Sequence, residues 1–248
     1  MKIIGLIPAS NKSTRFPGKS LEVIEGLPMF AHVYFRSKFT NLDNSFVCTD
    51  SYEILNKAKE LRIPTILTSN IHKNGTDRCA EAVKILSLNN NNLIVNIQGD
   101  EPLISPILIN RLIKNFNLKK MDILFPYLQI KKRNSLGHIK IVTNKDSQVL
   151  YMSRSDIPNN FRKNTLLKTQ VGATIFSKKA LDIFAKSKSQ NEYIEGVELL
   201  RVFETNLKMF CFKTTIKSKS VDYPKDLVYV KREIKKDIYL NRYKNLSL

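Results

Sequence analysis

The first segment with residues suited to phosphate chemistry follows an apolar run at the start of the chain. Residues 7–19 read Ile-Pro-Ala-Ser-Asn-Lys-Ser-Thr-Arg-Phe-Pro-Gly-Lys. Ligands of open α/β sheets gather outside the carboxyl ends of the strands, so backbone N–H groups, Arg15 and Lys19 are well placed to hold phosphates. The spacing matches neither a Walker A loop nor a Rossmann fingerprint, and a solvated basic loop is an equal alternative.

The second segment presents two carboxylates where an apolar strand ends. Residues 95–102 read Val-Asn-Ile-Gln-Gly-Asp-Glu-Pro, so Asp100 and Glu101 follow the strand directly. Carboxylates at a strand end suit a hard cation such as Mg²⁺ when phosphate oxygens and water complete its ligand set. Taken alone, however, Asp-Glu-Pro after a strand is more often a turn that leads into a helix.

Two further segments are ordinary turns when taken alone. Residues 74–78, Asn-Gly-Thr-Asp-Arg, form an adequate helix start. Residues 220–227, Ser-Val-Asp-Tyr-Pro-Lys-Asp-Leu, form an Asp-x-Pro turn into a helix. Neither segment indicates any chemistry by itself.

The four segments together, in this order, resemble those of the CMP-KDO synthetases, also called 3-deoxy-manno-octulosonate cytidylyltransferases. Ser-Thr-Arg-x-Pro-Gly-Lys is similar to the nucleotide-binding loop of that family, and Asn-x-Gln-Gly-Asp-Glu-Pro to its magnesium motif. Gly-Thr-Asp-Arg is similar to its cytosine segment, and Val-Asp-Tyr-Pro-Lys-Asp-Leu to its late Val-Asp-Thr-Pro-Glu-Asp-Leu. The resemblance extends from Pro8 to Leu227.

The resemblance implies roles for the matched residues around the nucleotide. Arg15 and Lys19 would hold the triphosphate and then the departing pyrophosphate, whereas Asp100 and Asp222 would bind Mg²⁺. Lys19, Arg15 and Asp100 are therefore the catalytic candidates. The nucleotide-binding candidates are Ala9, Ser13, Arg15, Lys19, Thr76, Arg78 and Gln98, of which Thr76 and Arg78 would contact the cytosine ring.

The resemblance also implies an acceptor site, and here the sequence departs from the family. Arg154, within Tyr-Met-Ser-Arg-Ser-Asp-Ile-Pro, is a partner for a sugar carboxylate because guanidinium binds carboxylate bidentately. The family's His-Leu-Gly-x-Tyr is replaced by a segment from Gln170 to Thr174, and a glutamine by Leu199. Gln170 and Glu198 complete the acceptor candidates.

The departures leave two alternatives open. The implied activity is transfer of CMP from CTP to 3-deoxy-D-manno-octulosonate (KDO), but the altered pocket favours a related acidic sugar, such as an amino-KDO or a nonulosonic acid. Ser10 replaces the arginine that usually follows Ala9, although Lys12 could supply the charge, so a catalytically weakened nucleotide-binding paralogue is the second alternative. Intact Asp100, Asp222 and Lys19 argue against it.

The elements that must position these residues alternate in the manner of βαβ units. We expect an α/β, Rossmann-like open sheet, mixed but mostly parallel, with helices on both faces; the resemblance implies the nucleotide-diphospho-sugar transferase fold. The chain would be one domain, 1–248, with a small β-rich, sugar-binding lobe at roughly 121–176. The predicted strands are 2–7, 45–48, 65–67, 93–97, 122–130, 139–142, 149–152, 170–176 and 208–213. The predicted helices are 29–39, 52–61, 76–86, 105–117, 178–186, 194–205 and 224–234.

The composition limits the possible partners. The formal charge of +19 could indicate nucleic-acid binding, but the basic residues are dispersed from Lys2 to Lys244, and the longest cluster, Lys131-Lys132-Arg133, lacks stacking aromatics. We therefore expect no specific nucleic-acid binding. No apolar run approaches the roughly 20 residues that span a bilayer, so we expect a cytoplasmic protein without membrane insertion. We also expect a homodimer. We expect Cys48, Cys79 and Cys211 to be reduced, and we assign no role to His32, His72 or His138.

Overall fold

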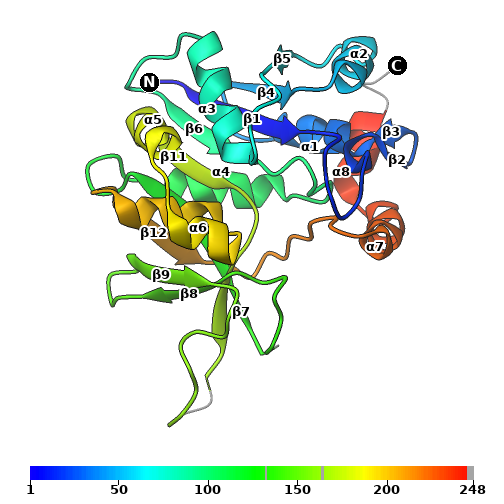
Figure 1. Cartoon of the computed structure of the whole chain (residues 1–248). Coiled ribbons are helices and arrows are strands. Elements are labelled where there is room, and N and C mark those ends of the chain that lie inside the picture. Colours follow the sequence, from blue (N-terminus) through cyan, green and yellow to red (C-terminus); the bar gives the residue numbers. More distant parts are fainter. Residues whose placement is uncertain (132, 163–164, 245–248) are drawn as a thin grey trace.

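The computed structural model describes residues 1–131, 133–162 and 165–244. Lys132, the middle residue of the longest basic cluster, therefore lies outside the described residues. The fold has one large sheet, a two-stranded sheet formed by β2 (Val23–Ile24) and β3 (Leu27–Pro28), and helices packed around the large sheet (Figure 1).

The first half of the chain forms a parallel sheet. Its strands lie in the order β5-β4-β1-β6 and pair in parallel throughout. Right-handed crossover helices are the usual way to connect such strands, and α1, α2 and α3 lie between them in the chain. The bounds are β1 (Ile3–Ala9), α1 (Met29–Ser37), β4 (Asn44–Thr49), α2 (Tyr52–Glu60), β5 (Thr65–Leu67), α3 (Gly75–Ile85) and β6 (Leu93–Asn96).

The second half extends the same sheet mostly by antiparallel pairing. β11 pairs with β6 and β7, β10 pairs with β7 and β8, and β9 forms the edge. The strands at 121–176, where we predicted a small β-rich lobe, therefore belong to the large sheet. The bounds are β7 (Ile123–Ile130), β8 (Lys140–Thr143), β9 (Val149–Ser153), β10 (Leu167–Gln170), β11 (Thr174–Ser177) and β12 (Met209–Lys213), which pairs with β7 in parallel.

Two predicted elements are wrong, and a glycine interrupts each of them. The predicted strand 170–176 is two strands, because Gly172 between them has a φ of +68°. The predicted helix 194–205 is α6 (Gln190–Glu195) followed by the 3₁₀ helix η2 (Glu198–Glu204), because Gly196 ends α6 with a φ of +59°. Both φ values lie in the left-handed region, which interrupts a strand or a helix and which glycine enters without a steric penalty.

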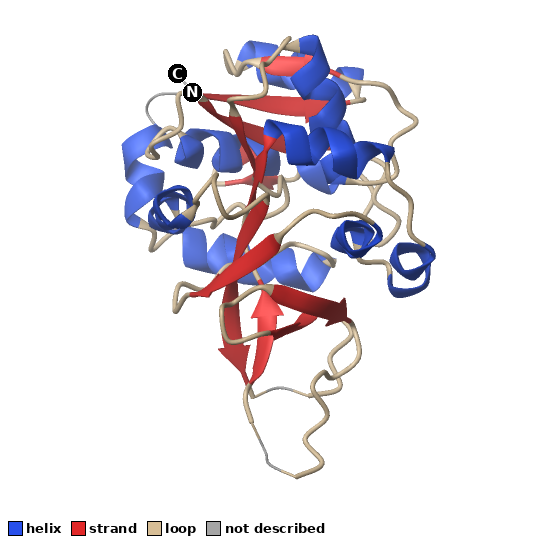
Figure 2. Cartoon of the chain, turned by 90° about the vertical axis from the view of Figure 1, so that its left-hand side faces the viewer, coloured by secondary structure: helices blue, strands red, loops and turns tan. Residues whose placement is uncertain are grey.

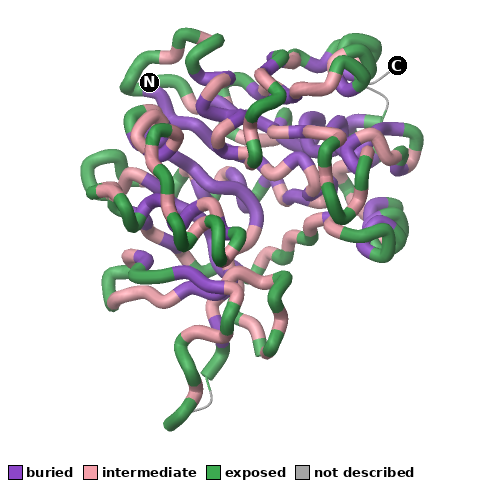
Figure 3. The backbone as a smooth tube through the Cα atoms, in the orientation of Figure 1, coloured by how far each residue is buried: buried purple, intermediate pink, exposed green. Residues whose placement is uncertain are grey.

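Helices cover both faces of the sheet, as predicted. Alternate residues of β1 point to opposite faces: Ile7 packs in the core that includes α1, α4 (Pro106–Asn115), α7 (Pro224–Ile234) and α8 (Ile238–Tyr243). Leu6 packs in the core that includes α3, α5 (Lys178–Lys186) and η2. The central strands are correspondingly buried along their length (Figure 3). Burial of each large apolar side chain contributes roughly 1.5–3 kcal/mol.

The helices do not cover the whole length of the sheet. Figure 2 shows helices around the upper part of the molecule and only strands and loops at its lower end. Figure 1 labels β7, β8 and β9 at this end, and β10 lies between β7 and β8 in the sheet. Ligands of an α/β sheet bind outside the carboxyl ends of its parallel strands, which here are the ends of β1 and β6.

No helix among the described residues is long and apolar enough to cross a membrane. Cys48, Cys79 and Cys211 are free and buried, which agrees with their prediction as reduced core residues.

Candidate active site

The loop after β1 brings Arg15 and Lys19 to the carboxyl ends of the parallel strands. The chain turns at Gly18, whose φ is +73°, and the N–H of Gly18 donates to the carbonyl of Asn11 at 3.2 Å. The short 3₁₀ helix η1 (Lys19–Leu21) begins there. Because Lys19 is only 9% exposed, its stem is buried while its ammonium reaches the end of β6.

The Lys19 ammonium contacts both predicted metal ligands. Its Nζ donates to Asp100 Oδ2 at 2.5 Å and to the carbonyl of Val221 at 2.8 Å, and lies 4.0 Å from Asp222 Oδ1. Asp100 and Asp222, which no sequence spacing relates, thus converge on one cation. This position is favourable for positive charge.

Gly99 allows Asp100 to approach the loop after β1. A Cβ atom at Gly99 would lie 2.3 Å from the carbonyl oxygen of Pro8, a distance that real Cβ atoms do not adopt. Only glycine therefore permits the ends of β1 and β6 to come this close. The glycine of the Gln-Gly-Asp sequence is therefore required sterically, because a side chain at position 99 would overlap the Pro8 carbonyl.

Asp222 is held at the start of α7. Asp226 Oδ2 accepts hydrogen bonds from the backbone N–H groups of Asp222 and Tyr223 at 3.1 and 2.9 Å, and the N–H of Val221 donates to the carbonyl of Asp100 at 2.9 Å. Arg15 Nη2 donates to Asp222 Oδ1 at 2.7 Å, and its guanidinium lies 5.7 Å from the centre of the Tyr223 ring. Arg15 and Lys19 therefore both neutralise this acidic pair.

Two cavities meet at the cluster. The first, of about 360 Å³, follows the loop after β1 and the start of α3. The second, of about 580 Å³, lies between the cluster and the antiparallel extension. Arg15, Gln98 and Asp100 line both. A group transferred from a ligand in one cavity to a ligand in the other would pass these three side chains.

The first cavity has a strong excess of positive charge. Ala9, Ser13 and Gln98, three of the predicted nucleotide-binding residues, line it together with Arg15 and Lys19. Its described lining residues contain one carboxylate, that of Asp100, and the five cations Lys12, Arg15, Lys19, Lys73 and Arg78. Such a surface suits a polyphosphate, because several positive groups neutralise several negative oxygens.

The two predicted cytosine-contacting residues have different positions. Arg78 lines the first cavity but is 3% exposed, donating to Thr68 Oγ1 at 2.7 Å and pairing with Asp50 at 3.3 Å. Thr76 is fully buried, and its hydroxyl donates to Glu198 Oε1 at 2.7 Å. Thr76 is absent from the described lining of either cavity, so its hydroxyl supports the wall from behind.

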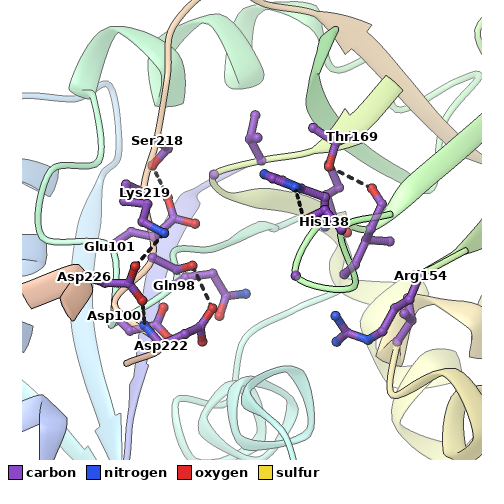
Figure 4. A pocket seen from close by; sticks show the side chains of 18 of the residues that line it. Gln98, Asp100, Glu101, His138, Arg154, Thr169, Ser218, Lys219, Asp222 and Asp226 are labelled. Carbon is purple, nitrogen blue, oxygen red and sulfur yellow. Dashed lines mark hydrogen bonds and ion pairs between the residues drawn. The ribbon is translucent and has the colours of Figure 1, made fainter. Parts of the chain in front are cut away.

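The second cavity brings the predicted acceptor residues together. Arg154, Gln170 and Glu198 all line it, as does Leu199, which is 2% exposed. Figure 4 shows Asp100, Asp222 and Gln98 on one side of the pocket, and His138, Thr169 and Arg154 on the other. The pocket therefore has an acidic side and, opposite it, a side that includes Thr169 of the antiparallel extension.

Arg154 is anchored by backbone carbonyls. Its Nε donates to Glu195, its Nη1 to Leu136 and its Nη2 to Gly196, at 2.8, 2.6 and 2.9 Å. A guanidinium has five N–H groups, so two more can still donate to a ligand. Glu198 is less able to bind a ligand as a carboxylate. Burial raises its pKa, and the hydrogen bonds from Thr76 and the charge of Arg201 only partly oppose that effect.

Sequence reasoning missed several residues of the second cavity. Glu101 is 7% exposed, accepts a hydrogen bond from the Ser218 hydroxyl, and burial raises its pKa to about 7. Its place beside Asp100 was visible in the sequence, but its burial was not. His138, which the sequence left without a role, and Thr169 also line this cavity.

The donor set fits a divalent cation only if a substrate completes it. Asp100 and Asp222 supply carboxylate oxygens, the ligands that Mg²⁺ prefers. Within the described part of the chain, no group of three or more His, Cys, Asp or Glu side chains is arranged to hold a metal ion. Phosphate oxygens and water would therefore have to provide the remaining ligands.

A family model described as cytidylyltransferase matches residues 4–216. A 3-deoxy-manno-octulosonate cytidylyltransferase of Fusobacterium nucleatum is 36% identical, with 96% of this chain and 98% of that protein covered. An 8-amino-3,8-dideoxy-manno-octulosonate cytidylyltransferase of Shewanella frigidimarina is 34% identical, with 92% and 96% covered.

The fold is similar to that of a solved enzyme–nucleotide complex. The structure of a CMP:2-keto-3-deoxy-manno-octonic acid synthetase complexed with CTP matches with a TM-score of 0.88 at 27% identity. The match covers 95% of this chain and 99% of the other.

Proposed function

Because the chain belongs to the cytidylyltransferase family, we propose that it transfers CMP from CTP to KDO and releases pyrophosphate. The observation that carries this proposal is the junction of the two cavities at Arg15, Gln98 and Asp100. The first cavity has the charge for a triphosphate, and the second is within the usual size range of small-molecule sites, about 300–1,000 Å³. The α-phosphorus would lie at the junction.

The reaction needs no covalent intermediate. The anomeric hydroxyl of the sugar attacks the α-phosphorus in line and a new P–O bond forms. The bond to pyrophosphate breaks, and the hydroxyl proton is released to water. Phosphoryl transfer of this kind depends on positioning and charge neutralisation. Arg15 and Lys19 would bind the phosphates, and the two remaining donors of Arg154 would orient the acceptor carboxylate.

Asp100 and Asp222 would hold Mg²⁺, which when bound neutralises charge that develops on the phosphate oxygens. The ammonium of Lys19 now lies against Asp100 and near Asp222. A cation bound to these carboxylates would repel the Lys19 ammonium, because both are positively charged. The repulsion would favour movement of the ammonium toward the phosphates.

KDO is favoured over its 8-amino analogue by the second cavity. Its wall opposite the carboxylate pair includes Leu128, Ile130, Ile139 and Thr169. An ammonium buried against these four side chains would need a hydrogen-bonding anion to offset its desolvation. None of the four provides one, and the Glu198 carboxyl that lines the same cavity already accepts a hydrogen bond from the Thr76 hydroxyl. The neutral hydroxyl at carbon 8 of KDO has no such requirement.

An acceptor screen tests the proposal. Pyrophosphate release would be measured with Mg²⁺, with CTP or UTP, and with KDO, 8-amino-KDO or a nonulosonic acid. We expect turnover with CTP and KDO and much slower turnover with UTP. A site that hydrogen-bonds the edge of one base leaves buried polar groups unpaired when another base is bound. Preference for 8-amino-KDO or a nonulosonic acid would contradict the acceptor assignment, and equal turnover with UTP would contradict the assignment of CTP as the nucleotide. CTP binding without turnover on any acceptor would support the weakened paralogue.

The predicted homodimer stays a prediction, which sedimentation of the purified protein would test.

A further inference from the structure

Lys140 is a fully buried lysine that the reaction proposed above does not use. It begins β8, and its side chain is 1% exposed. Its Nζ donates to the carbonyls of Ser135 at 2.8 Å and His138 at 3.0 Å, and also to the carbonyl of Arg154. An ammonium has three N–H groups, so these three carbonyls use all of them.

The charge of Lys140 is also compensated inside the protein. Asp156 Oδ1 lies 3.6 Å from Nζ, and the N–H of Asn134 holds the other carboxylate oxygen at 2.9 Å. A buried ammonium is costly unless it is paired and hydrogen-bonded. Lys140 meets both conditions, so the site is built around a positive charge.

The carbonyls that Lys140 collects belong to one wall of the second cavity. Ser135, Gly137, His138 and Ile139 line this cavity, and so does Arg154. Arg154 in turn donates from Nη1 to the carbonyl of Leu136 at 2.6 Å. Lys140 and Arg154 therefore bind three carbonyls of the segment 135–138 between them. Lys140 also binds the backbone carbonyl of Arg154.

We propose that Lys140 is a positioning residue for the acceptor: it holds the segment 135–139 and Arg154 in the arrangement that forms the acceptor wall. The inference rests on the proposed function, which makes the second cavity the acceptor site. Lys140 itself is absent from the described lining of either cavity. It acts through the residues it positions and touches neither the nucleotide side nor the carboxylate pair.

The decisive variant is Lys140→Met, which keeps an unbranched side chain of similar length and removes the charge and all three donors. Three partly buried carbonyls would lose the hydrogen bond from Lys140, and the wall would loosen. We expect the KM for the acceptor to rise about 10-fold or more, as when a residue that orients ligand-binding groups is lost. The KM for CTP should stay within about twofold and kcat at saturating acceptor within about threefold.

Lys168→Met is the matched control. Lys168 lies on β10 opposite Ile141 of β8, and its Nζ donates to Thr143 Oγ1 at 2.6 Å. It belongs to the same sheet extension but is absent from the described lining of both cavities. This variant should leave both KM values within about twofold.

Hydrogen exchange separates this proposal from the proposed function. The amide of His138 donates to the Ser135 carbonyl that Lys140 also binds. Exchange of a peptide spanning residues 134–139 should therefore accelerate in Lys140→Met and not in Lys168→Met, whatever the acceptor is. Faster exchange with an unchanged acceptor KM would mean that the second cavity is not the acceptor site.

Unchanged exchange in folded Lys140→Met would overturn the role of Lys140. If that variant does not fold, Asp156→Asn replaces it in the same measurements, because it removes only the counter-charge. We then expect a rise in acceptor KM of about threefold with faster exchange of residues 134–139. Wild-type values of both quantities in folded Asp156→Asn would equally overturn the proposal.

Discussion

At the residue scale, each of the two proposed metal ligands is paired with a cation from the loop after β1. Asp100 is paired with Lys19, and Asp222 with Arg15. This loop is therefore attached by its charges to the two side chains that we propose as metal ligands. Binding of a cation and of the phosphates would exchange these partners, so the loop and the ligands are coupled electrostatically.

The first prediction concerns the two carboxylates. Asp100→Asn and Asp222→Asn should each lower the rate of pyrophosphate release by at least about 100-fold, because a carboxamide keeps the shape but lacks the charge that the metal requires. The measurement is turnover with CTP and KDO over a range of Mg²⁺ concentrations, together with circular dichroism to check folding.

Asp182→Asn is the control for loss of a carboxylate, because Asp182 pairs with Lys178 on α5 and is absent from the described lining of the two cavities. It should have nearly wild-type activity. A near-wild-type rate for Asp100→Asn or Asp222→Asn at limiting Mg²⁺ would show that the residue is not a ligand.

At the scale of elements, the site depends on the close approach of β1 and β6. Gly99→Ala should destabilise the protein by about 1–3 kcal/mol, because the added methyl group would overlap the Pro8 carbonyl and force the strand ends apart. It should also reduce activity, since Asp100 follows directly. Urea denaturation and turnover would measure the two effects.

Gly137→Ala is the control for the steric argument, because a Cβ there meets no atom within 4 Å. Its stability should stay within about 0.5 kcal/mol of wild type. Equal stability of Gly99→Ala and wild type would mean that the strand ends do not approach as described.

A second prediction at this scale concerns the packing of α8 on α1. His32 Nδ1 contacts the Tyr243 hydroxyl and Nε2 contacts the Ile24 carbonyl, both at 2.7 Å. Burial lowers the pKa of His32 to about 4 from its ordinary value of 6.5. Between these values the unfolded chain binds a proton that the folded chain does not. The free energy of unfolding should therefore fall as pH drops from about 6.5 to about 4, by an amount on the order of 3 kcal/mol.

The measurement is urea denaturation at a series of pH values, for wild type and for His32→Gln. The variant lacks the titrating group, so its stability should depend less on pH in this interval, although its stability at neutral pH should be lower. The same pH dependence in both proteins would exclude His32 as the cause.

At the scale of the whole molecule, the net charge of +19 distinguishes this chain. Part of this charge is concentrated at the first cavity, which five cationic side chains line. Elsewhere many lysines lie on helices in solvent, such as Lys57, which pairs with Glu60. Charge dispersed in this way is typical of a solvated surface. In our proposal only cations of the first cavity and Arg154 of the second bind a substrate.

We therefore expect no sequence-specific binding of nucleic acid. Weak binding to polyanions should occur at low salt and fall steeply as salt rises, because each neutralised phosphate releases counterions. A titration with DNA and RNA at physiological salt, with unlabelled competitor of unrelated sequence, is the measurement. Tight binding that discriminates between sequences would contradict this expectation.

The sequence by itself determined the local elements and the chemical groups at their ends. The apolar periodicity of residues 52–61 and 224–234 predicted α2 and α7, because helix periodicity and capping residues act over a few positions. The resemblance identified Asp100, Asp222, Arg15 and Lys19, and all four lie together beyond the carboxyl ends of β1 and β6. The family to which the chain belongs was also predictable from these motifs.

Only the tertiary structure decided how distant segments meet. Asp222 reaches Asp100 because the segment after β12 returns along the end of β6, where Val221 pairs with Asp100. The left-handed turns at Gly172 and Gly196 broke elements that periodicity made continuous. Lys140 looked like any surface lysine in the sequence, although three carbonyls surround it in the fold. These features depend on contacts between residues far apart in the chain, which local spacing does not encode.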